Sequence, residues 1–369
     1  MHEASPSTDS AAAVLAGSSS SSSGSSGATT VHRLQPQDHG RWDAFVQNCP
    51  EATFFHRAGW HTIMEQGFGH AGHFLYAEQD GRITGVLPLV HMRGLLCGKA
   101  LVSLPFCVYG GIAASGAPAR HALDAQAQAL ARQLGVGHLE YRQRDGVLPD
   151  GWQGKPLYAT FRKTLLADDE QNLLAIPRKQ RAVVRKAIAA GLHGTLDDDL
   201  DRFYPLYAGS VHRLGTPVFA RRHFALLRTV FGSDCDILTI CHGSEAQASV
   251  LSFYFRGEVL PYYGAGSVLA RRTGANDFLY WELMRRAAAR GLRQFDFGRS
   301  KTGTGAFDFK KNWGFAPQPL PYAYKLFGAA ALPDVNPLNP KYALFIRAWR
   351  RLPLSLANLL GPHLVRQLG

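Results

Sequence analysis

The fold is decided by residues 262–315, which read YYGAGSVLARRTGANDFLYWELMRRAAARGLRQFDFGRSKTGTGAFDFKKNWGF. Residues 259–264 are short, aromatic and bounded by glycine, a pattern that predicts a β-strand. Asn276 is predicted to cap the helix that follows, Gly291 to end it, and residues 295–298 to form the next strand. Between them, apolar side chains recur at helical spacing, at Tyr280, Leu283, Met284, Ala287 and Ala288. The chain therefore reads as a strand, a basic turn, a helix and a second strand.

The turn before this helix carries positive charge. Arg271, Arg272 and Gly274 precede the first helical turn, where free N–H groups and the helix dipole favour an anion. These residues are therefore candidates to bind a phosphate or a diphosphate. Asp277 argues for the alternative of an ordinary capped helix, because its carboxylate already supplies an anion in that turn.

A cationic and aromatic region follows the second strand. Arg299 and Lys301 precede a glycine-rich loop at residues 302–305, and two lysines follow it. Acyl transfer to an amine passes through a charged tetrahedral species, so the carbonyl must be polarised and the two partners held close together. Cationic side chains supply such a charge. The region is therefore a candidate site for acyl transfer, with Arg299 and Lys301 as candidate substrate-binding residues.

The residues after the glycine-rich loop alternate between aromatic and charged side chains, and residues 307–311 are predicted to form a strand. In a strand, Lys310 and Lys311 would lie on opposite faces, so the two lysines are not expected to share a role. Asp296 is a candidate base, with a structural hydrogen-bonding role as the alternative. The aromatic pair Tyr262 and Tyr263 is a candidate to shape an acceptor channel, although one of the two is expected in the core.

Several of these segments resemble known families. The spacing Arg271-x-x-Gly274-x-Asn276 resembles the acyl-CoA pyrophosphate loop of the GCN5-related N-acetyltransferase superfamily, in which Gly or Ala usually takes the last position. Residues 275–282, 295–301 and 307–315 look like FemAB-related proteins, in particular the branch associated with bacterial PEP-CTERM/exosortase systems. The resemblance extends upstream and covers about residues 31–327.

The resemblance implies a fold, an activity and a site. It implies an α/β (α+β) fold of two tandem acetyltransferase-like (GNAT) domains, each a mixed, mostly antiparallel sheet flanked by helices. It also implies an acyltransferase that acylates or aminoacylates an amine of a cell-envelope or exopolysaccharide precursor, with acyl-CoA or aminoacyl-tRNA as co-substrate. Lys310 stands where FemAB relatives carry a lysine near the acyl-transfer site. The resemblance therefore implies that Lys310 polarises the donor carbonyl.

Two parts of the sequence share an order of predicted elements. Residues 135–141 parallel residues 291–297, because in both segments glycine ends a helix and an apolar-acidic-aromatic triplet begins a strand. This order predicts the duplication of one domain. The expected divisions are a disordered Ser-rich tail at 1–30, one domain at 31–170, a second at 171–328, and a Pro-rich link with a basic segment at 329–369.

Between the two predicted domains lies a strongly basic helix at residues 177–191. Its residues Lys179, Arg185 and Lys186 are scarcely matched by acidic residues nearby. One interpretation is a solvated helix face, which is the usual meaning of a run of charge. The other is a surface that grips an anionic substrate or the acceptor stem of a tRNA. The segment resembles the basic helix that opens the second domain of FemAB-like proteins.

Composition limits the partners and the chemistry. The chain has 369 residues and a formal net charge of +12, which favours anionic partners such as phosphorylated substrates, nucleic acid or an anionic membrane surface. No stable nucleic-acid partner is expected. Five cysteines without a C-x-x-C pair, and histidines without ligand spacing, predict buried thiols and no metal site.

The sequence also bears on location. It contains no run long and apolar enough to span a bilayer and no signal peptide. We therefore expect a cytoplasmic protein, with peripheral contact at the inner membrane as a further option. Residues 342–368 are basic and amphipathic, and they either lie on an anionic membrane surface or pack back on the domain.

Three functions are compatible with these patterns. The first is an acyltransferase acting on a small-molecule or envelope-precursor substrate. The second is an aminoacyl-tRNA-dependent peptidoglycan bridge ligase, which the absence of the long helical arm usual in such ligases disfavours. The third is a catalytically inactive, anion-binding scaffold for envelope or exopolysaccharide assembly, which Asn276 in the cofactor loop and the lack of a clear base would permit.

Overall fold

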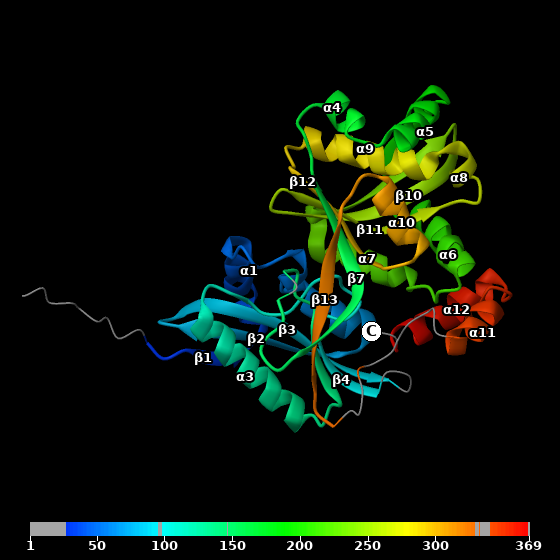
Figure 1. Cartoon of the computed structure of the whole chain (residues 1–369). Coiled ribbons are helices and arrows are strands. Elements are labelled where there is room, and N and C mark those ends of the chain that lie inside the picture. The colour runs from blue at the N-terminus through cyan, green and yellow to red at the C-terminus, as the bar shows by residue number, and fades with distance from the viewer. Residues whose placement is uncertain (1–26, 95–97, 146, 329–331, 333–339, 368–369) are drawn as a thin grey trace, which may run out of the picture.

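One sheet runs through both halves of the molecule. The computed structural model describes residues 27–94, 98–145, 147–328, 332 and 340–367. The first half of the chain contributes β1 (Thr30–Arg33), β2 (Ala71–Gln79), β3 (Arg82–Gly94), β4 (Gly98–Ser103), β5 (Ala113–Ala114), β6 (His138–Tyr141) and β7 (Gln153–Thr164). The second half contributes β8 (Leu192–Leu196), β9 (Cys235–His242), β10 (Glu245–Phe255), β11 (Glu258–Gly266), β12 (Gln294–Lys301) and β13 (Pro317–Leu326). Their order across the sheet is β1-β2-β3-β4-β6-β13-β7-β12-β11-β10-β9-β8, with β5 beside β3 (Figure 1).

The order of the elements repeats. In the first unit, β2, β3 and β4 are antiparallel, and α3 (Ala117–Gln133) leads to β6, which pairs parallel to β4. In the second unit, β9, β10 and β11 are antiparallel, and α9 (Ala275–Ala289) leads to β12, which pairs parallel to β11. The strands β1 and β8 add an outer antiparallel strand to each unit. The predicted duplication and the mixed, mostly antiparallel sheet are therefore confirmed.

The two units exchange their last strands. β7 follows β6 in the chain but pairs with β12 of the second unit, whereas β13 follows β12 but pairs with β6 of the first unit. β7 and β13 also pair with each other and run between the two halves of the molecule (Figure 1). Neither unit therefore has a complete sheet of its own. The predicted boundary at residue 170 falls inside α4 (Asp169–Leu174) and does not separate two self-contained sheets.

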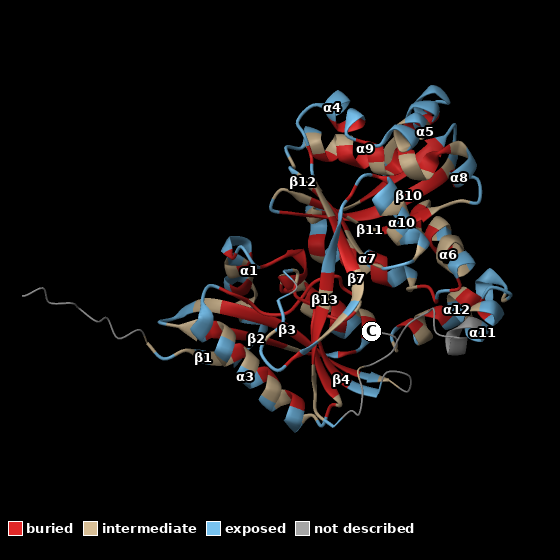
Figure 2. Ribbon diagram, viewed as in Figure 1, coloured by how far each residue is buried: buried red, intermediate tan, exposed pale blue. Residues whose placement is uncertain are grey.

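Helices cover the sheet over three clusters of buried side chains. α3 closes the core of the first unit, while α4, α5 (Arg178–Ala189) and α9 close a second core. The third core joins the two halves under α1 (His39–Asn48), α2 (Gly59–Thr62), the π-helix η3 (Ile63–Phe68), α6 (Phe203–Leu214) and α7 (Arg221–Phe231). Buried residues follow the strands through both halves (Figure 2).

Aromatic rings hold the two halves together in this shared core. Phe54, in the short turn η2 (Phe54–His56), stacks on Phe253 of β10 with ring centroids 4.5 Å apart. The ring centroids of Trp60 of α2 and Phe231 of α7 lie 5.2 Å apart. Because Phe54 and Trp60 belong to the first unit and Phe231 and Phe253 to the second, the cores of the two units are fused.

The predicted strand at residues 307–311 is wrong. These residues belong to α10 (Gly305–Asn312), whose N-terminus is capped by the Thr304 side chain accepting a hydrogen bond from the Phe307 N–H. A five-residue alternation is too short to distinguish a strand from one face of a helix. The Thr304 cap, within the glycine-rich loop, favours the helix over the strand.

Two other local predictions need correction. The mostly apolar run at residues 101–108 predicts a strand, but β4 ends at Ser103, because Leu104 (φ 60°) and Phe106 (φ 65°) take left-handed conformations that turn the chain away. Asn276 does not cap α9. The residue before this helix is Gly274, with φ 76°, and a separate short helix, α8 (Ala270–Thr273), precedes it. Only glycine adopts such a φ without steric cost.

The C-terminal segment packs back on the molecule, as one of the two interpretations predicted. α11 (Pro340–Trp349) and α12 (Leu354–Val365) lie beside α6 (Figure 1). In the described part of the chain, no helix is long and apolar enough to cross a bilayer. Of the tail predicted at 1–30, residues 1–26 lie outside the described residues, as does Cys97, and Thr30 already belongs to β1. The thiols of the other four cysteines are buried and free.

Candidate functional site

The parallel pair at the centre of the second unit opens into a cavity. β11 and β12 pair only at Glu258 with Gln294 and at Val259 with Phe295. Past these residues the two strands enclose a cavity of about 300 Å³, which also reaches α9, α10 and a loop of the first unit. Its lining consists of Val108, Pro261, Tyr262, Gly264, Tyr280, Phe297, Gly298, Arg299 and Lys310. Among the described residues that line it are two cations and no carboxylate, so it suits a group that carries or develops negative charge.

Lys310 reaches this cavity from α10. Its Nζ donates to the main-chain carbonyl oxygens of Phe297 (2.6 Å), Gly298 (3.1 Å) and Arg299 (3.0 Å). These carbonyls converge because β12 has a bulge between Asp296 and Arg299. Burial lowers the pKa of Lys310 to about 7, against the attraction of the Asp296 carboxylate. Its neighbour in the chain, Lys311, is exposed, so the two lysines do have different environments, on a helix instead of a strand.

Arg299 and two tyrosines form the rest of the polar wall. The Arg299 Nη1 donates to the Tyr322 hydroxyl at 2.8 Å, and its guanidinium lies 4.6 Å from the centre of the Tyr158 ring. The Tyr262 hydroxyl donates to the carbonyl oxygen of Phe106 at 2.8 Å. The hydroxyl of Tyr280 lies close to Gly264, where a Cβ would come within 2.7 Å of it. Gly264 therefore keeps room for the Tyr280 ring at the cavity.

Asp296 does not line the cavity. Its Oδ1 accepts the Gly298 N–H at 2.7 Å, and its Oδ2 accepts the Tyr109 hydroxyl at 3.0 Å and lies 3.2 Å from the Arg162 Nε. Burial raises the pKa of this carboxyl, with Arg162 opposing the shift. The carboxylate ties β12 to β7 and to the loop of the first unit. This geometry supports the structural alternative for Asp296 over the role of base.

As expected, one of the two adjacent tyrosines of β11 lines the cavity and the other lies in the core. Tyr262 lines the cavity, whereas Tyr263 belongs to the shared core and its hydroxyl lies 3.2 Å from the Nε2 of His223. Alternation along a strand sends neighbouring side chains to opposite faces of the sheet. Tyr262 is therefore the member of the pair that can contact a substrate in this cavity.

The predicted anion-binding turn is closed. Gly274 is buried against α5, where an added Cβ would lie 2.9 Å from the Val183 side chain. Arg271 and Arg272 are exposed on α8 and, like Gly274 and Asn276, do not line the cavity. Anion binding at this turn stays a prediction, and the packing of α5 against it does not favour it.

The remaining predicted binding residues lie apart from the cavity. Lys179, Arg185 and Lys186 are exposed on α5, and Arg185 makes only a long contact of 3.8 Å with the exposed Glu170. Lys301 sits at the end of β12, 5.8 Å from the centre of the Tyr158 ring. Their roles in substrate binding therefore stay predictions.

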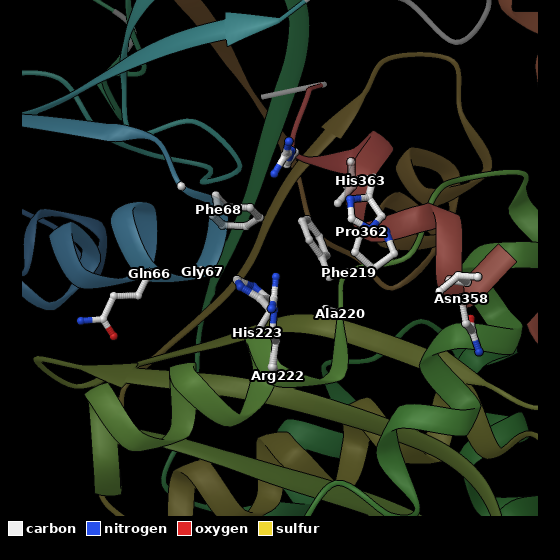
Figure 3. A pocket seen from close by; sticks show the side chains of 14 residues that line it. Gln66, Gly67, Phe68, Phe219, Ala220, Arg222, His223, Asn358, Pro362 and His363 are labelled. Carbon is white, nitrogen blue, oxygen red and sulfur yellow. The ribbon is translucent and has the colours of Figure 1, made fainter. Parts of the chain in front are cut away.

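A second cavity, of about 450 Å³, lies where three segments meet. Phe68 comes from η3, His223 from α7 and His363 from α12, around one space (Figure 3). His223 is buried and its Nδ1 has no hydrogen-bond partner in the described part of the chain. Arg222 and Arg366 also line this cavity, which therefore combines aromatic walls with positive charge.

Aromatic contacts separate the two cavities. Phe68, in the wall of the second cavity, stacks on Phe106 with ring centroids 4.2 Å apart. Phe106 in turn accepts the hydrogen bond from Tyr262, in the wall of the first cavity. Phe106 thus lies between the two cavities, with its ring against Phe68 and its main-chain carbonyl oxygen bonded to Tyr262.

The sequence reasoning missed part of this site. From the sequence, Tyr280 is predicted only as a residue of the apolar helix stripe, and Gly264 only as the end of a strand. Val108 belongs to the loop that replaces the expected strand after Ser103. The left-handed Leu104 and Phe106 that shape this loop leave no sequence signal, because bulky residues rarely take that conformation.

Comparison with known proteins agrees with the fold. The family described as Acetyltransferase (GNAT) domain matches residues 178–311, the segment that contains β11, α9, β12 and α10. No curated protein matches the sequence significantly.

Solved structures resemble nearly the whole chain. A structure of FemX is 15% identical, with a TM-score of 0.62, over 81% of this chain and 98% of that one. L-PGS from Bacillus licheniformis is 14% identical, with a TM-score of 0.54, over 87% and 99%. A tandem GNAT protein from the clavulanic acid biosynthesis pathway is 14% identical, with a TM-score of 0.51, over 83% and 100%. At these identities the likeness shows the fold, which is that of tandem GNAT proteins.

Proposed function

We propose that this protein is an acyltransferase of the FemAB-like type, which moves an acyl or aminoacyl group to an amine. The observation that carries this proposal is the cavity in the opened β11–β12 pair, lined by Lys310 and Arg299 and by no carboxylate. A fold of tandem GNAT proteins and a GNAT-domain match over the same strands support it. The donor carbonyl would lie between the two strands.

The chemistry requires charge stabilisation and proton removal. The amine nitrogen attacks the carbonyl carbon to form the new C–N bond, and the carbonyl oxygen becomes an oxyanion. The bond to the donor's leaving group then breaks, and the proton lost by the amine nitrogen passes to the departing group, which is the thiolate sulfur of an acyl-CoA or the ribose oxygen of an aminoacyl-tRNA. In this proposal, Arg299 and protonated Lys310 stabilise the oxyanion. One of the three carbonyls now held by Lys310 would give way to it.

Two donor classes fit different features. The GNAT-domain match favours acyl-CoA, as in the superfamily that the sequence resembles. The likeness to FemX and the exposed basic face of α5 favour aminoacyl-tRNA. The closed turn at Gly274 weighs against a diphosphate bound there, and hence against acyl-CoA held in the usual way. A comparison of acetyl-CoA and aminoacyl-tRNA as donors separates the two.

The acceptor is proposed to enter from the second cavity. Its aromatic walls and the exposed Arg222 suit an amphipathic molecule with an anionic group. An amine-bearing precursor of the cell envelope or of an exopolysaccharide has this chemistry, in line with the resemblance to FemAB-related proteins of PEP-CTERM/exosortase systems. This assignment rests on the sequence resemblance and the lining of the cavity.

One observation favours an inactive scaffold as the second candidate. In the described part of the chain, neither a carboxylate nor an imidazole lines the first cavity to remove the proton of the amine. A scaffold would bind anions without turnover, and salt would weaken that binding steeply. Turnover by the wild-type protein with either donor excludes this candidate.

The substitution Lys310→Met tests the proposed activity. It removes the only lysine of the first cavity, and we expect the rate of acyl transfer to fall by about 100-fold or more. In the wild type the rate should also decline as pH rises through about 7, because Lys310 loses its proton there. The residual rate of the variant should lack this decline.

The matched control is Lys311→Met, which removes the exposed neighbouring lysine of α10. It should leave both the rate and its pH dependence unchanged. Equal rates for Lys310→Met and the wild type would contradict the assignment of Lys310.

A further inference from the structure

α12 packs against the body of the protein mainly through small buried residues on one of its faces. α12 buries Ala357, Gly361 and Val365, and a Cβ at Gly361 would come within 2.8 Å of Val218. His70 lies 2.9 Å from the carbonyl oxygen of Arg366, so the end of α12 is held against the first unit. The helix pair thus has a defined inner face against the body of the protein.

The outer face of the same helices is apolar as well. Leu356, Leu359 and Leu360 are exposed residues of α12 outside its buried stripe, and Leu359, which also lines the second cavity, is 67% exposed. α11 adds Leu344, which is 73% exposed, and Phe345. We call the following residues the C-terminal apolar surface: Leu344, Phe345, Leu354, Leu356, Leu359 and Leu360. A helix that is apolar on both sides is typical of a helix with partners on both sides.

The charge around this surface has one sign. Residues 340–369 contain five Lys or Arg residues and no Asp or Glu. Arg347, Arg350 and Arg351 are exposed, and no salt bridge involves them in the described part of the chain. A second copy of this chain would bring like charges together across the surface, which opposes self-association. An anionic surface matches both the leucines and the arginines.

We propose that the C-terminal apolar surface docks this protein on an anionic lipid bilayer. The leucines of α12 enter the boundary between headgroups and acyl chains, and the arginines of α11 and of the turn after it contact lipid phosphates. Asn358 and Pro362 of the same helix line the second cavity. Docking therefore brings the mouth of that cavity close to the bilayer surface. The inference does not depend on the proposed acyl transfer.

Vesicle co-sedimentation of the full chain tests the proposal. We expect the protein to sediment with phosphatidylcholine vesicles that contain phosphatidylglycerol, and about tenfold less with phosphatidylcholine alone. Added salt should weaken the binding. The triple variant Leu356→Ser, Leu359→Ser, Leu360→Ser should lose about tenfold in partitioning. Arg347→Ser with Arg351→Ser, which replaces two exposed side chains, should lose the preference for the anionic lipid.

Two matched controls distinguish binding through this surface from nonspecific binding to vesicles. Val268→Ser removes an apolar side chain that is 75% exposed on another part of the molecule. Replacement of Lys179, Arg185 and Lys186 by serine removes the same sign of charge from α5. Both controls should bind vesicles as the wild type does, and circular dichroism and thermal unfolding should show all variants folded.

Three results would overturn the proposal. The first is wild-type partitioning of the folded leucine variant, and the second is loss of binding in the α5 control instead. The third is a wild-type dimer in solution, measured by light scattering without lipid, that the leucine variant converts to a monomer. That result would assign the surface to a second copy of the chain.

Discussion

At the residue scale, the two candidate catalytic residues illustrate what a motif can and cannot predict. Lys310 was selected from a resemblance, and it does reach the cavity between β11 and β12. Asp296, whose type and position also make it a candidate, is buried among three partners and does not line the cavity. Sequence identifies a residue type near a site. It does not reveal whether a bulge turns the side chain toward substrate or into the core.

The pH dependence of stability tests the environment of Lys310. Its pKa is about 7 in the folded protein and 10.5 when unperturbed, so between these values the unfolded chain binds a proton that the folded protein lacks. The free energy of unfolding should therefore rise with pH from about 7 to 10.5, by up to about 1.4 kcal/mol per pH unit. Below pH 7 this contribution is constant.

Urea unfolding of the wild type and of Lys310→Met across this range is the measurement. The variant has no such group, so the difference between the two proteins should grow with pH through the window. Parallel curves would show that Lys310 is as well solvated in the folded as in the unfolded state.

At the element scale, the packing of α5 against α9 is a feature that the sequence could not predict. The basic helix, the glycine and the crossover helix were each predicted as separate features, but α5 lies directly on the first turn of α9. The pattern of residues 307–311 failed for a related reason. Five residues cannot fix a period, and the cap at Thr304 acts from outside them. Long periodic segments such as α3 and α9 were predictable because their stripes extend over several turns.

Substitution of two glycines tests how closely α5 packs against the turn before α9. Gly274 and Gly291 both have φ 76°, but only Gly274 has a neighbour, Val183, within reach of an added Cβ. Gly291→Ala should lower the free energy of unfolding by about 1 kcal/mol, from backbone conformation alone. Gly274→Ala should cost about 2–4 kcal/mol, since it adds the clash. Equal losses in urea unfolding would show that the turn before α9 is open.

At the scale of the whole molecule, the exchanged strands make the two units interdependent. The duplication was predictable from two short segments, because each helix exit carries the same glycine and triplet. The exchange of β7 and β13 was not predictable. It depends on which edge of the sheet each strand joins, and both edges accept an apolar strand equally well.

Separation of the two units tests this interdependence. A fragment of residues 27–170 keeps β6 and β7 but lacks β13, the strand that pairs with both. It should show no cooperative thermal transition by circular dichroism, because two strand edges and part of the shared core are exposed. Co-expression with residues 171–369 as a second chain should restore a cooperative transition. A fragment that unfolds cooperatively by itself would show that the first unit is self-sufficient.

The central claim is that an acyl donor occupies the cavity between β11 and β12, and donor binding to a cavity-filling variant tests it most directly. Gly264→Val places a side chain in that cavity, whereas Gly40→Val adds one on α1, where nothing lies within 4 Å. Isothermal titration with acetyl-CoA and with an aminoacyl-tRNA should show that one donor binds the wild type and the Gly40 variant equally. For the folded Gly264 variant, the account predicts binding at least about tenfold weaker. Equal affinity for all three proteins would contradict the account.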